Sequence, residues 1–204
     1  MAAGQAQMLL FRDQPVANAE PLFEDSYYIP RLLQDTLGLD VTEQFERLVD
    51  TAPWTDPAGD NFRYRGRELP RQKCFLTRSP PGMIRKYGYP GFQYGSMDAY
   101  RPMEAVPVVY HFAQELAHLS VATDLNHVIG TRYRDAGDHI SFHHDKVRDI
   151  APGSSIFSLS FGETREMHIA TPTEVFERAI ALGEGDLVII GPRTNVLHKH
   201  AIVT

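Results

Sequence analysis

The stretch that decides the fold is Thr131–Arg165, TRYRDAGDHISFHHDKVRDIAPGSSIFSLSFGETR, with His143, His144 and Asp145 at its centre. If this centre is extended, alternate side chains point to the same face, so His143 and Asp145 converge while His144 points away. A second imidazole would complete a set of two histidines and one carboxylate, which holds Fe(II) and keeps three coordination positions open. The sequence offers His200 for this place, in the strand-like TNVLHKHAIVT.

The bare His-x-Asp tripeptide is weak evidence by itself, because most such tripeptides are ordinary surface or cap residues. The identity of the second histidine is also open from spacing alone. His198 precedes His200 by two positions, so on a strand both imidazoles point to one face. We expect His200 to be the ligand and keep His198 as the alternative.

Composition and charge limit the classes of protein to which the chain can belong. Its 204 residues suit one domain, and 43% hydrophobic with 23% charged residues is typical of a globular protein. No apolar run is long enough to cross a bilayer, and the single cysteine, Cys74, cannot form an internal disulfide. We therefore expect a soluble, intracellular monomer with no membrane partner. The net charge of −6 means that nucleic acid could bind only through a local basic patch.

Hydrophobic spacing predicts an arm and two helices before residue 126. We expect residues 1–30 to form the arm, with one or two strands, and a helix near 43–51 with Thr42 as its N-cap. A second helix is expected over 105–119, where apolar residues share one face. After Asn126 come short strand-like runs separated by turn residues: HVIGTRY, DHISFHH, SSIFSLSFG, EMHIAT, VFERAIAL, DLVIIG and VLHKHAIV. Such a succession predicts an antiparallel double sheet or barrel.

Between these two halves lies a stretch, residues 62–94, in which basic and aromatic residues alternate. A stretch of this kind can hold phosphates while its rings stack on bases. Its commoner meaning is a hairpin with solvated charges and a half-buried aromatic face, and the residues alone favour the hairpin. The set includes Arg63, Arg65, Arg67, Arg71, Lys73, Arg78, Phe62, Tyr64, Phe75, Tyr89 and Tyr94.

Several of these segments together resemble the AlkB family of Fe(II)/2-oxoglutarate dioxygenases, most closely its alkylated-DNA and RNA repair branch. The segments are RYRDAGDHISFHHD, SSIFSLSFG with the following Arg165, LGEGDLVII, LHKHAIV, RGRELPRQK and YGYPGFQY. The resemblance covers about residues 60–204. It implies an α+β fold that is mainly β: a double-stranded β-helix, or jelly roll, with supporting N-terminal helices. Within a single domain, 1–204, we expect an arm and supporting helix (1–60), a segment like a substrate lid (61–100) and the jelly-roll core (127–204).

The resemblance also implies roles for individual residues. His143, Asp145 and His200 would hold Fe(II), while 2-oxoglutarate and O2 would take the open positions. Tyr133 and Thr131 would contact the 2-oxoglutarate co-substrate. The reaction would give succinate and CO2 and hydroxylate a C–H bond, and on an N-methyl group the product would release formaldehyde. The substrate side would be formed by Arg165, Arg63, Arg65, Arg71, Tyr94 and Val147.

Three departures from the family pattern bear on these roles. Thr131 stands where the family has an asparagine, and Lys146 and Val147 stand where repair enzymes carry an acidic residue that attracts a cationic methylated base. The family also continues into a strand with two arginines, the first of which clamps the 2-oxoglutarate carboxylate. Because the sequence ends at Thr204, we expect it to be truncated, with Arg193 as another possible clamp.

Three functional hypotheses follow from the resemblance and its departures. The first is an AlkB-type demethylase that acts on alkylated DNA or RNA, supported by the basic aromatic stretch. The second is the same dioxygenase chemistry on a small molecule or a protein side chain, supported by Lys146, Val147 and the acidic net charge. The third is a non-catalytic binding module with the same fold, supported by Thr131 and the missing arginines.

Overall fold

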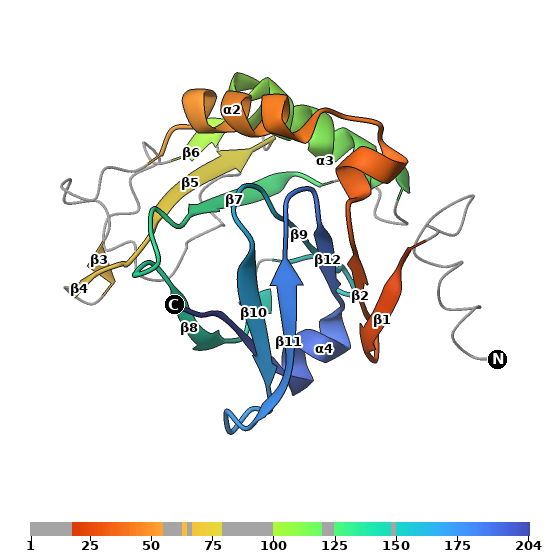
Figure 1. The fold of residues 1–204 in the computed structure, drawn as a ribbon, viewed down its shortest axis with the longest axis vertical. Coiled ribbons are helices and arrows are strands. Elements are labelled where there is room, and N and C mark those ends of the chain that lie inside the picture. Colours follow the sequence, from red (N-terminus) through yellow and green to blue (C-terminus); the bar gives the residue numbers. More distant parts are fainter. Residues whose placement is uncertain (1–17, 55–62, 65–66, 79–99, 120–124, 148–149) are drawn as a thin grey trace.

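The computed structural model describes residues 18–54, 63–64, 67–78, 100–119, 125–147 and 150–204 (Figure 1). Short strands are the most frequent elements, and the two long helices lie on one side of them. The strands are β1 (Glu20–Phe23), β2 (Ser26–Ile29), β3 (Arg63–Tyr64), β4 (Arg67–Glu68), β5 (Gln72–Thr77), β6 (Tyr100–Pro102), β7 (His127–Arg132), β8 (Ile140–His143), β9 (Ile156–Leu159), β10 (Arg165–Ala170), β11 (Phe176–Leu182), β12 (Leu187–Ile190) and β13 (Lys199–Ile202).

Two four-stranded antiparallel sheets form the core of the fold. One has the strand order β11-β10-β13-β8 and the other β1-β2-β12-β9. Apolar side chains from the two sheets pack in one shared cluster, which includes Leu22, Met167, Ile180, Val188 and Ile202. Two facing sheets with their hydrophobic sides together form the jelly roll, so the predicted fold class is confirmed.

The boundaries of this core differ from the expected 127–204. Strands β1 and β2 of the N-terminal arm complete the second sheet, because β2 pairs with β12. Strand β7 joins a third sheet of order β6-β5-β7 instead, in which β5 runs parallel to β6 and antiparallel to β7. The buried strand β5 lies inside the segment 61–100 that was expected to resemble a substrate lid. Since a buried strand cannot act as a lid, the prediction of a lid applies only to the other residues of that segment.

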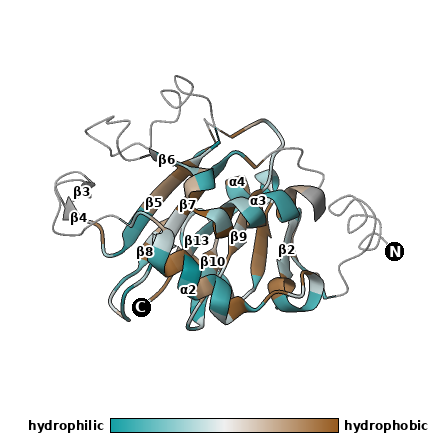
Figure 2. Ribbon diagram, turned by 90° about the horizontal axis from the view of Figure 1, so that it is seen from above, coloured by the Kyte–Doolittle hydropathy of each residue, from teal (hydrophilic) through white to brown (hydrophobic). Residues whose placement is uncertain are grey.

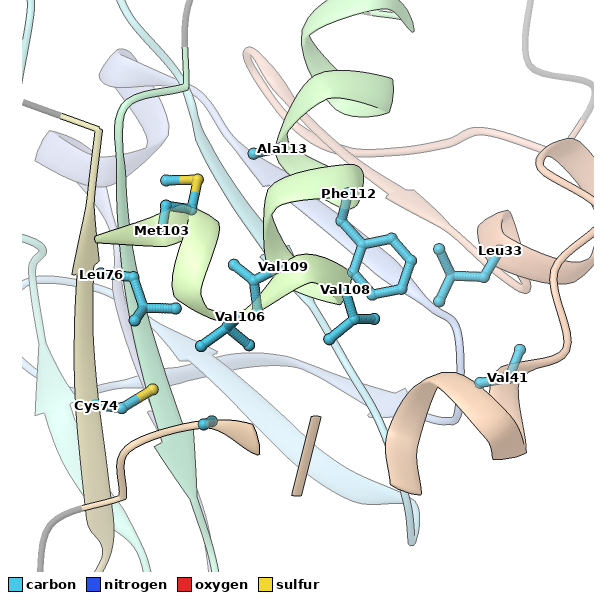
Figure 3. Packing of buried hydrophobic residues seen from close by; sticks show 11 residues of the cluster. Leu33, Val41, Cys74, Leu76, Met103, Val106, Val108, Val109, Phe112 and Ala113 are labelled. Carbon is cyan, nitrogen blue, oxygen red and sulfur yellow. The ribbon is translucent and has the colours of Figure 1, made fainter. Parts of the chain in front are cut away.

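The two long helices and a π-helical turn cover the outer side of the third sheet and of the sheet that contains β12. Helix α2 (Val41–Thr51) and helix α3 (Pro107–Leu119) pack against the β5 side chains Cys74 and Leu76, with Val106, Val109 and Phe112 among the buried contacts (Figure 3). Gly130 of β7 leaves room for the Cys74 side chain in this packing, because a Cβ at residue 130 would stand 2.3 Å from Cys74 Sγ. A π-helical turn, Leu32–Thr36, and α3 also cover β2 and β12. Figure 2, seen from above, shows α2 and α3 over the strands.

The helix boundaries correct two details of the sequence prediction. Helix α2 is capped by Asp40 and not by Thr42, because the Asp40 carboxylate accepts a hydrogen bond of 3.1 Å from the backbone N–H of Glu43. Helix α3 begins at Pro107, after a 3₁₀ turn (Met103–Ala105), where proline supplies the φ angle of a first helical residue. Within the part of the chain that is described, none of the helices is both long enough and apolar enough to cross a membrane.

The predicted strand VLHKHAIV is partly helical in the structure. Its first two residues belong to the short helix α4 (Pro192–Leu197), and the strand β13 starts at Lys199. The carboxylate of Asp25 accepts hydrogen bonds from the backbone N–H groups of Arg193 and Thr194, at 2.8 and 2.9 Å. These two N–H groups in the first turn of the helix would otherwise have no intrahelical acceptor. A partner so distant in sequence could not be read from the local pattern.

Candidate metal centre

Two neighbouring strands bring the predicted ligands together. His143 is the last residue of β8 and His200 lies in β13, and the two residues face each other directly in the antiparallel register. Asp145 Oδ1 lies 3.8 Å from His143 Nε2, and Asp145 Oδ2 lies 3.4 Å from His200 Nε2. One ligand atom from each side chain lies within 4.8 Å of the others. The three residues therefore form a compact cluster that could hold one metal ion.

The reason for this convergence differs from the one that the sequence suggested. Strand β8 ends at His143, so Asp145 lies in the following loop and not on the same strand face. The loop nevertheless turns the carboxylate toward His143 and His200. His144 points elsewhere, as expected, and its Nδ1–H donates a hydrogen bond of 2.7 Å to the carbonyl oxygen of Asn195.

Asn195 holds the loop that carries Asp145. Its side chain lies on α4 and is only 2% exposed. The Asn195 Oδ1 accepts a 2.8 Å hydrogen bond from the backbone N–H of Asp145, and its Nδ2 donates a 2.9 Å bond to the carbonyl of the same residue. Together with the bond from His144, three interactions fix the metal loop against the helix that precedes His200. The sequence analysis missed Asn195, because nothing in its local sequence distinguishes it from any other asparagine.

We expect Asn195→Ala to lower the affinity for a divalent metal by about tenfold to a hundredfold, as other losses of support around metal ligands do. The physical reason is that the backbone of Asp145 loses both partners and its carboxylate is no longer oriented. Titration with Mn(II) measures the effect. The control is Asn126→Ala, the same change at an exposed asparagine whose backbone carbonyl, which the change retains, accepts hydrogen bonds from Thr77 and Arg78. Equal affinities in the two variants would contradict this role.

The donor set fits Fe(II) in type, burial and protonation. Burial lowers the pKa of His143, which overrides the opposite effect of Asp145 and keeps the imidazole neutral near pH 7. Burial also lowers the pKa of His200 to about 4. A neutral imidazole is the form that binds a metal. His143 Nδ1–H donates to the Ser141 carbonyl at 2.9 Å, which fixes the ring and leaves Nε2 available.

His198, the alternative ligand, lies apart from this cluster. It stands at the end of α4, where its Nδ1 lies 2.7 Å from Glu177 Oε2 and its Nε2 lies 3.4 Å from Glu24 Oε2. Its ring also packs against Phe23, with 4.2 Å between ring centroids. Among the described residues, the group that could hold a metal contains His200 and not His198.

The residues expected to contact the co-substrate are Thr131, which lies in β7 of the third sheet, and Tyr133, which follows that strand. Thr131 and Lys73 face each other across β7 and β5, and Lys73 Nζ donates a 2.9 Å hydrogen bond to Thr131 Oγ1. Tyr133 follows β7 and packs against the cluster between the two main sheets. Burial raises the pKa of the Tyr133 hydroxyl to about 12, so this group stays protonated and can donate. Arg71, only 8% exposed, donates from Nη1 to the His139 carbonyl at 2.8 Å.

Arg165 holds the loop between β7 and β8 and the end of β13. Its guanidinium donates to the carbonyl oxygens of Asp135, Asp138 and Val203 at 3.0, 2.7 and 2.7 Å. It also lies over the Tyr133 ring, 5.4 Å from the centroid. These contacts describe a residue that orders the surroundings of Tyr133, and the predicted contact of Arg165 with substrate stays a prediction.

The other residues predicted to contact substrate are either exposed or not among the residues whose side chains the structure describes. Val147 is 52% exposed and follows Asp145 by two residues. Arg63 belongs to the hairpin of β3 and β4, whose backbone alone is described. Arg65 and Tyr94 lie outside the described residues.

Comparison with known proteins agrees with this geometry. The family model described as 2OG-Fe(II) oxygenase superfamily matches residues 25–204. A protein from Mus musculus named DNA oxidative demethylase ALKBH2 is 32% identical over 133 residues, which cover 61% of this chain and 55% of that protein. Its Homo sapiens counterpart is 31% identical, with coverage of 61% and 51%. The chain thus spans about half the length of the curated relatives that it matches.

A solved structure shows the same fold. The structure of OsALKBH1 aligns with a TM-score of 0.54 and 16% sequence identity, over 91% of this chain and 87% of that one. The match therefore concerns the fold. The family match covers every strand of the two main sheets except β1, and all three residues of the His143, Asp145 and His200 cluster. The chain belongs to the 2OG-Fe(II) oxygenase superfamily.

Proposed function

We propose that this protein is an Fe(II)- and 2-oxoglutarate-dependent dioxygenase that oxidatively demethylates alkylated DNA or RNA, as a soluble intracellular monomer. The observation that carries the proposal is the cluster of His143, Asp145 and His200, which offers the donor set that the superfamily's metal needs. The name of the ALKBH2 relatives supports an alkylated nucleic acid as the substrate.

The residues of the chain would bind and orient the reactants. His143, Asp145 and His200 would hold Fe(II), and Tyr133 with Thr131 would contact 2-oxoglutarate. The metal and the co-substrate supply the oxidising chemistry when they are bound. The ligands His143 and His200 are neutral, and the half-buried position of the cluster limits access of water. A target base would have to leave its stack to reach such a site, which favours single-stranded substrates.

The proposal predicts Fe(II)- and 2-oxoglutarate-dependent release of formaldehyde from methylated single-stranded DNA or RNA, with binding that weakens steeply as salt is added. If Arg63, Arg65 and Arg67 contact phosphates, changing all three to Ala should lower the slope of log K against log salt by up to about 2. Fluorescence anisotropy at several salt concentrations measures the slope. Arg47→Ala, which removes an exposed cation from α2, serves as the control.

Binding that is insensitive to salt, or undetectable for every oligonucleotide, would favour the second hypothesis, hydroxylation or demethylation of a small molecule or a protein side chain. Lys146 beside the metal loop and the net charge of −6 support that alternative. An assay of 2-oxoglutarate decarboxylation separates both enzymes from the third hypothesis, a non-catalytic binding module. Absence of turnover with Fe(II) present would leave only the binding module.

Val147 gives a prediction about the charge of the substrate. It is exposed beside the metal loop, so a carboxylate there would attract a positively charged methylated base. We expect Val147→Asp to raise kcat/KM for a cationic methylated base about two- to tenfold over its effect on a neutral one. Competition between the two lesions in one oligonucleotide series measures this ratio. Val175→Asp is the matched control, because Val175 is 63% exposed and lies just before β11. The idea fails if both variants shift the ratio equally.

A further inference from the structure

The loop that joins β7 to β8 is closed by a buried carboxylate. This β7–β8 loop runs from residue 133 to residue 139 (Figure 1). Asp138 is only 3% exposed, although residues 134–137 of the same loop are exposed. Its carboxylate accepts two hydrogen bonds from the Arg134 guanidinium, at 2.7 and 2.8 Å, and a third of 2.8 Å from the Arg134 backbone N–H. A bidentate pair of this kind allows one geometry, so it fixes both residues relative to each other.

The backbone of the β7–β8 loop is ordered from within as well. Asp135 Oδ1 accepts hydrogen bonds from the backbone N–H groups of Gly137 and Asp138, at 2.8 and 3.2 Å. The hydrogen bond from the Arg134 side chain holds the pKa of the Asp138 carboxyl below its usual value. The carboxylate is therefore ionised at neutral pH, and the pair with Arg134 is present under the conditions in which the protein works.

One end of the β7–β8 loop carries Tyr133. The Tyr133 ring packs against the cluster between the two main sheets, and the Arg165 guanidinium lies over it, 5.4 Å from the ring centroid. Arg165 in turn donates to the backbone carbonyls of Asp138 and Val203, both at 2.7 Å. Asp138 is thus tied to the start of the loop through its carboxylate and to the cation above the Tyr133 ring through its carbonyl.

The metal ligands have supports that do not involve the Asp138 side chain. His143 stands opposite His200 in the pairing of β8 with β13, and Asp145 is held by the Asn195 side chain. Loss of the Asp138 carboxylate should therefore release the Tyr133 end of the loop and leave the metal centre in place. This separation makes the role of the loop measurable.

We propose that Asp138 is a positioning residue, which raises the affinity for 2-oxoglutarate by holding the Tyr133 hydroxyl in place through the pair with Arg134 and the contact with Arg165. The inference rests on the proposed function, in which Tyr133 contacts this co-substrate. Asp138 does not act by contact, because its carboxylate is occupied by Arg134 and would repel an anion. It acts by preorganisation, since a donor that is already oriented binds without the entropic cost of ordering it.

A double-mutant cycle tests whether Asp138 acts through Tyr133. Calorimetry with the Mn(II)-loaded protein measures the affinity for 2-oxoglutarate in wild type, Tyr133→Phe, Asp138→Ala and the double variant. We expect Tyr133→Phe to weaken binding about tenfold, the effect of losing a hydrogen bond to a charged group. Asp138→Ala should weaken it about three- to tenfold. The double variant should be less than about twofold weaker than Tyr133→Phe, because two changes that act through one group are not additive.

Three further measurements separate this role from a general loss of structure. The affinity for Mn(II) should change by less than about twofold in every variant. Asp138→Asn retains an oxygen that accepts from Arg134, so its affinity for 2-oxoglutarate should stay within about threefold of wild type. Asp35→Ala is the matched control, because Arg31 and Asp35 form an exposed pair with the same four-residue spacing, at 3.4 Å, on the π-helical turn. It should leave both affinities unchanged.

Urea denaturation of each variant establishes that the protein is folded under the conditions of the titration. If Asp138→Ala does not fold, Arg134→Gln takes its place in the cycle. This change removes the bidentate pair and retains the backbone hydrogen bond to Asp138. The same weakening of 2-oxoglutarate, absent again in the Tyr133→Phe background, is then expected.

The outcomes distinguish this inference from the proposed function. The assignment of Asp138 is wrong, while the proposed function stands, if Asp138→Ala binds 2-oxoglutarate as wild type does or loses Mn(II) to the same extent. It is equally wrong if the losses in the double variant add in full, or if Tyr133→Phe has no effect. If Mn(II)-loaded wild type does not bind 2-oxoglutarate, both fall. If the cycle gives the expected result but no methylated oligonucleotide is demethylated, the assignment stands and the proposed substrate falls.

Discussion

His143→Ala should abolish Fe(II)-dependent turnover, with kcat/KM reduced by more than about a hundredfold, whereas His144→Ala should retain most of the activity. Loss of support around a metal ligand already costs about tenfold to a hundredfold, and removal of the ligand itself must cost more. His143 Nε2 points at Asp145 and lies opposite His200 in the register. The His144 ring is instead turned to Asn195. Turnover and Mn(II) affinity, measured on both variants, test the difference.

His144→Ala is a demanding control, because it changes the neighbouring residue of the same type. It removes one hydrogen bond to the Asn195 carbonyl, and a bond of this kind contributes about 1 kcal/mol. A reduction of metal affinity below about tenfold is therefore expected, through slight loosening of the Asp145 loop. Equal losses in the two variants would show that the metal is held by a different histidine.

The sequence predicted the three ligands because they lie in recognisable strand-like segments. It could not predict their geometry, because the contact between His143 and His200 depends on the register between β8 and β13. That register is a property of the whole sheet. The strand-face argument expected His143 and Asp145 to converge, and they do, but for a different reason: Asp145 lies past the end of β8 and is held by Asn195.

Similar limits apply to the fold. Period-two and helical spacing located nearly every strand and both long helices. The partners of the strands were not encoded locally: β2 pairs with β12 from the opposite end of the chain, and Asp25 caps α4. The basic aromatic stretch predicted a surface hairpin with solvated charges. Lys73 and Arg71 are buried instead, because Lys73 lies in β5, the middle strand of its sheet, and Arg71 directly precedes that strand.

The burial of Lys73 should cost stability, so Lys73→Met should stabilise the metal-free protein at neutral pH. The fall of the Lys73 pKa from 10.5 to about 8 corresponds to about 3 kcal/mol that opposes folding of the charged form. Loss of the bond to the Thr131 hydroxyl returns about 1 kcal/mol. The expected net gain in the free energy of unfolding is therefore about 2 kcal/mol at pH 7. Urea denaturation of the two proteins measures it.

The gain should also depend on pH in a defined direction. Below the folded pKa of about 8, Lys73 is charged in both states and the folded protein bears the full cost of burying the charge. Between about 8 and 10.5 the folded state has released the proton while the unfolded state still binds it, so the stability of wild type rises with pH. Met cannot titrate, so the advantage of Lys73→Met should shrink between pH 7 and pH 10, and groups common to both proteins cancel in the difference. An advantage that stays constant or grows over this range would mean that Lys73 is fully compensated in the folded protein.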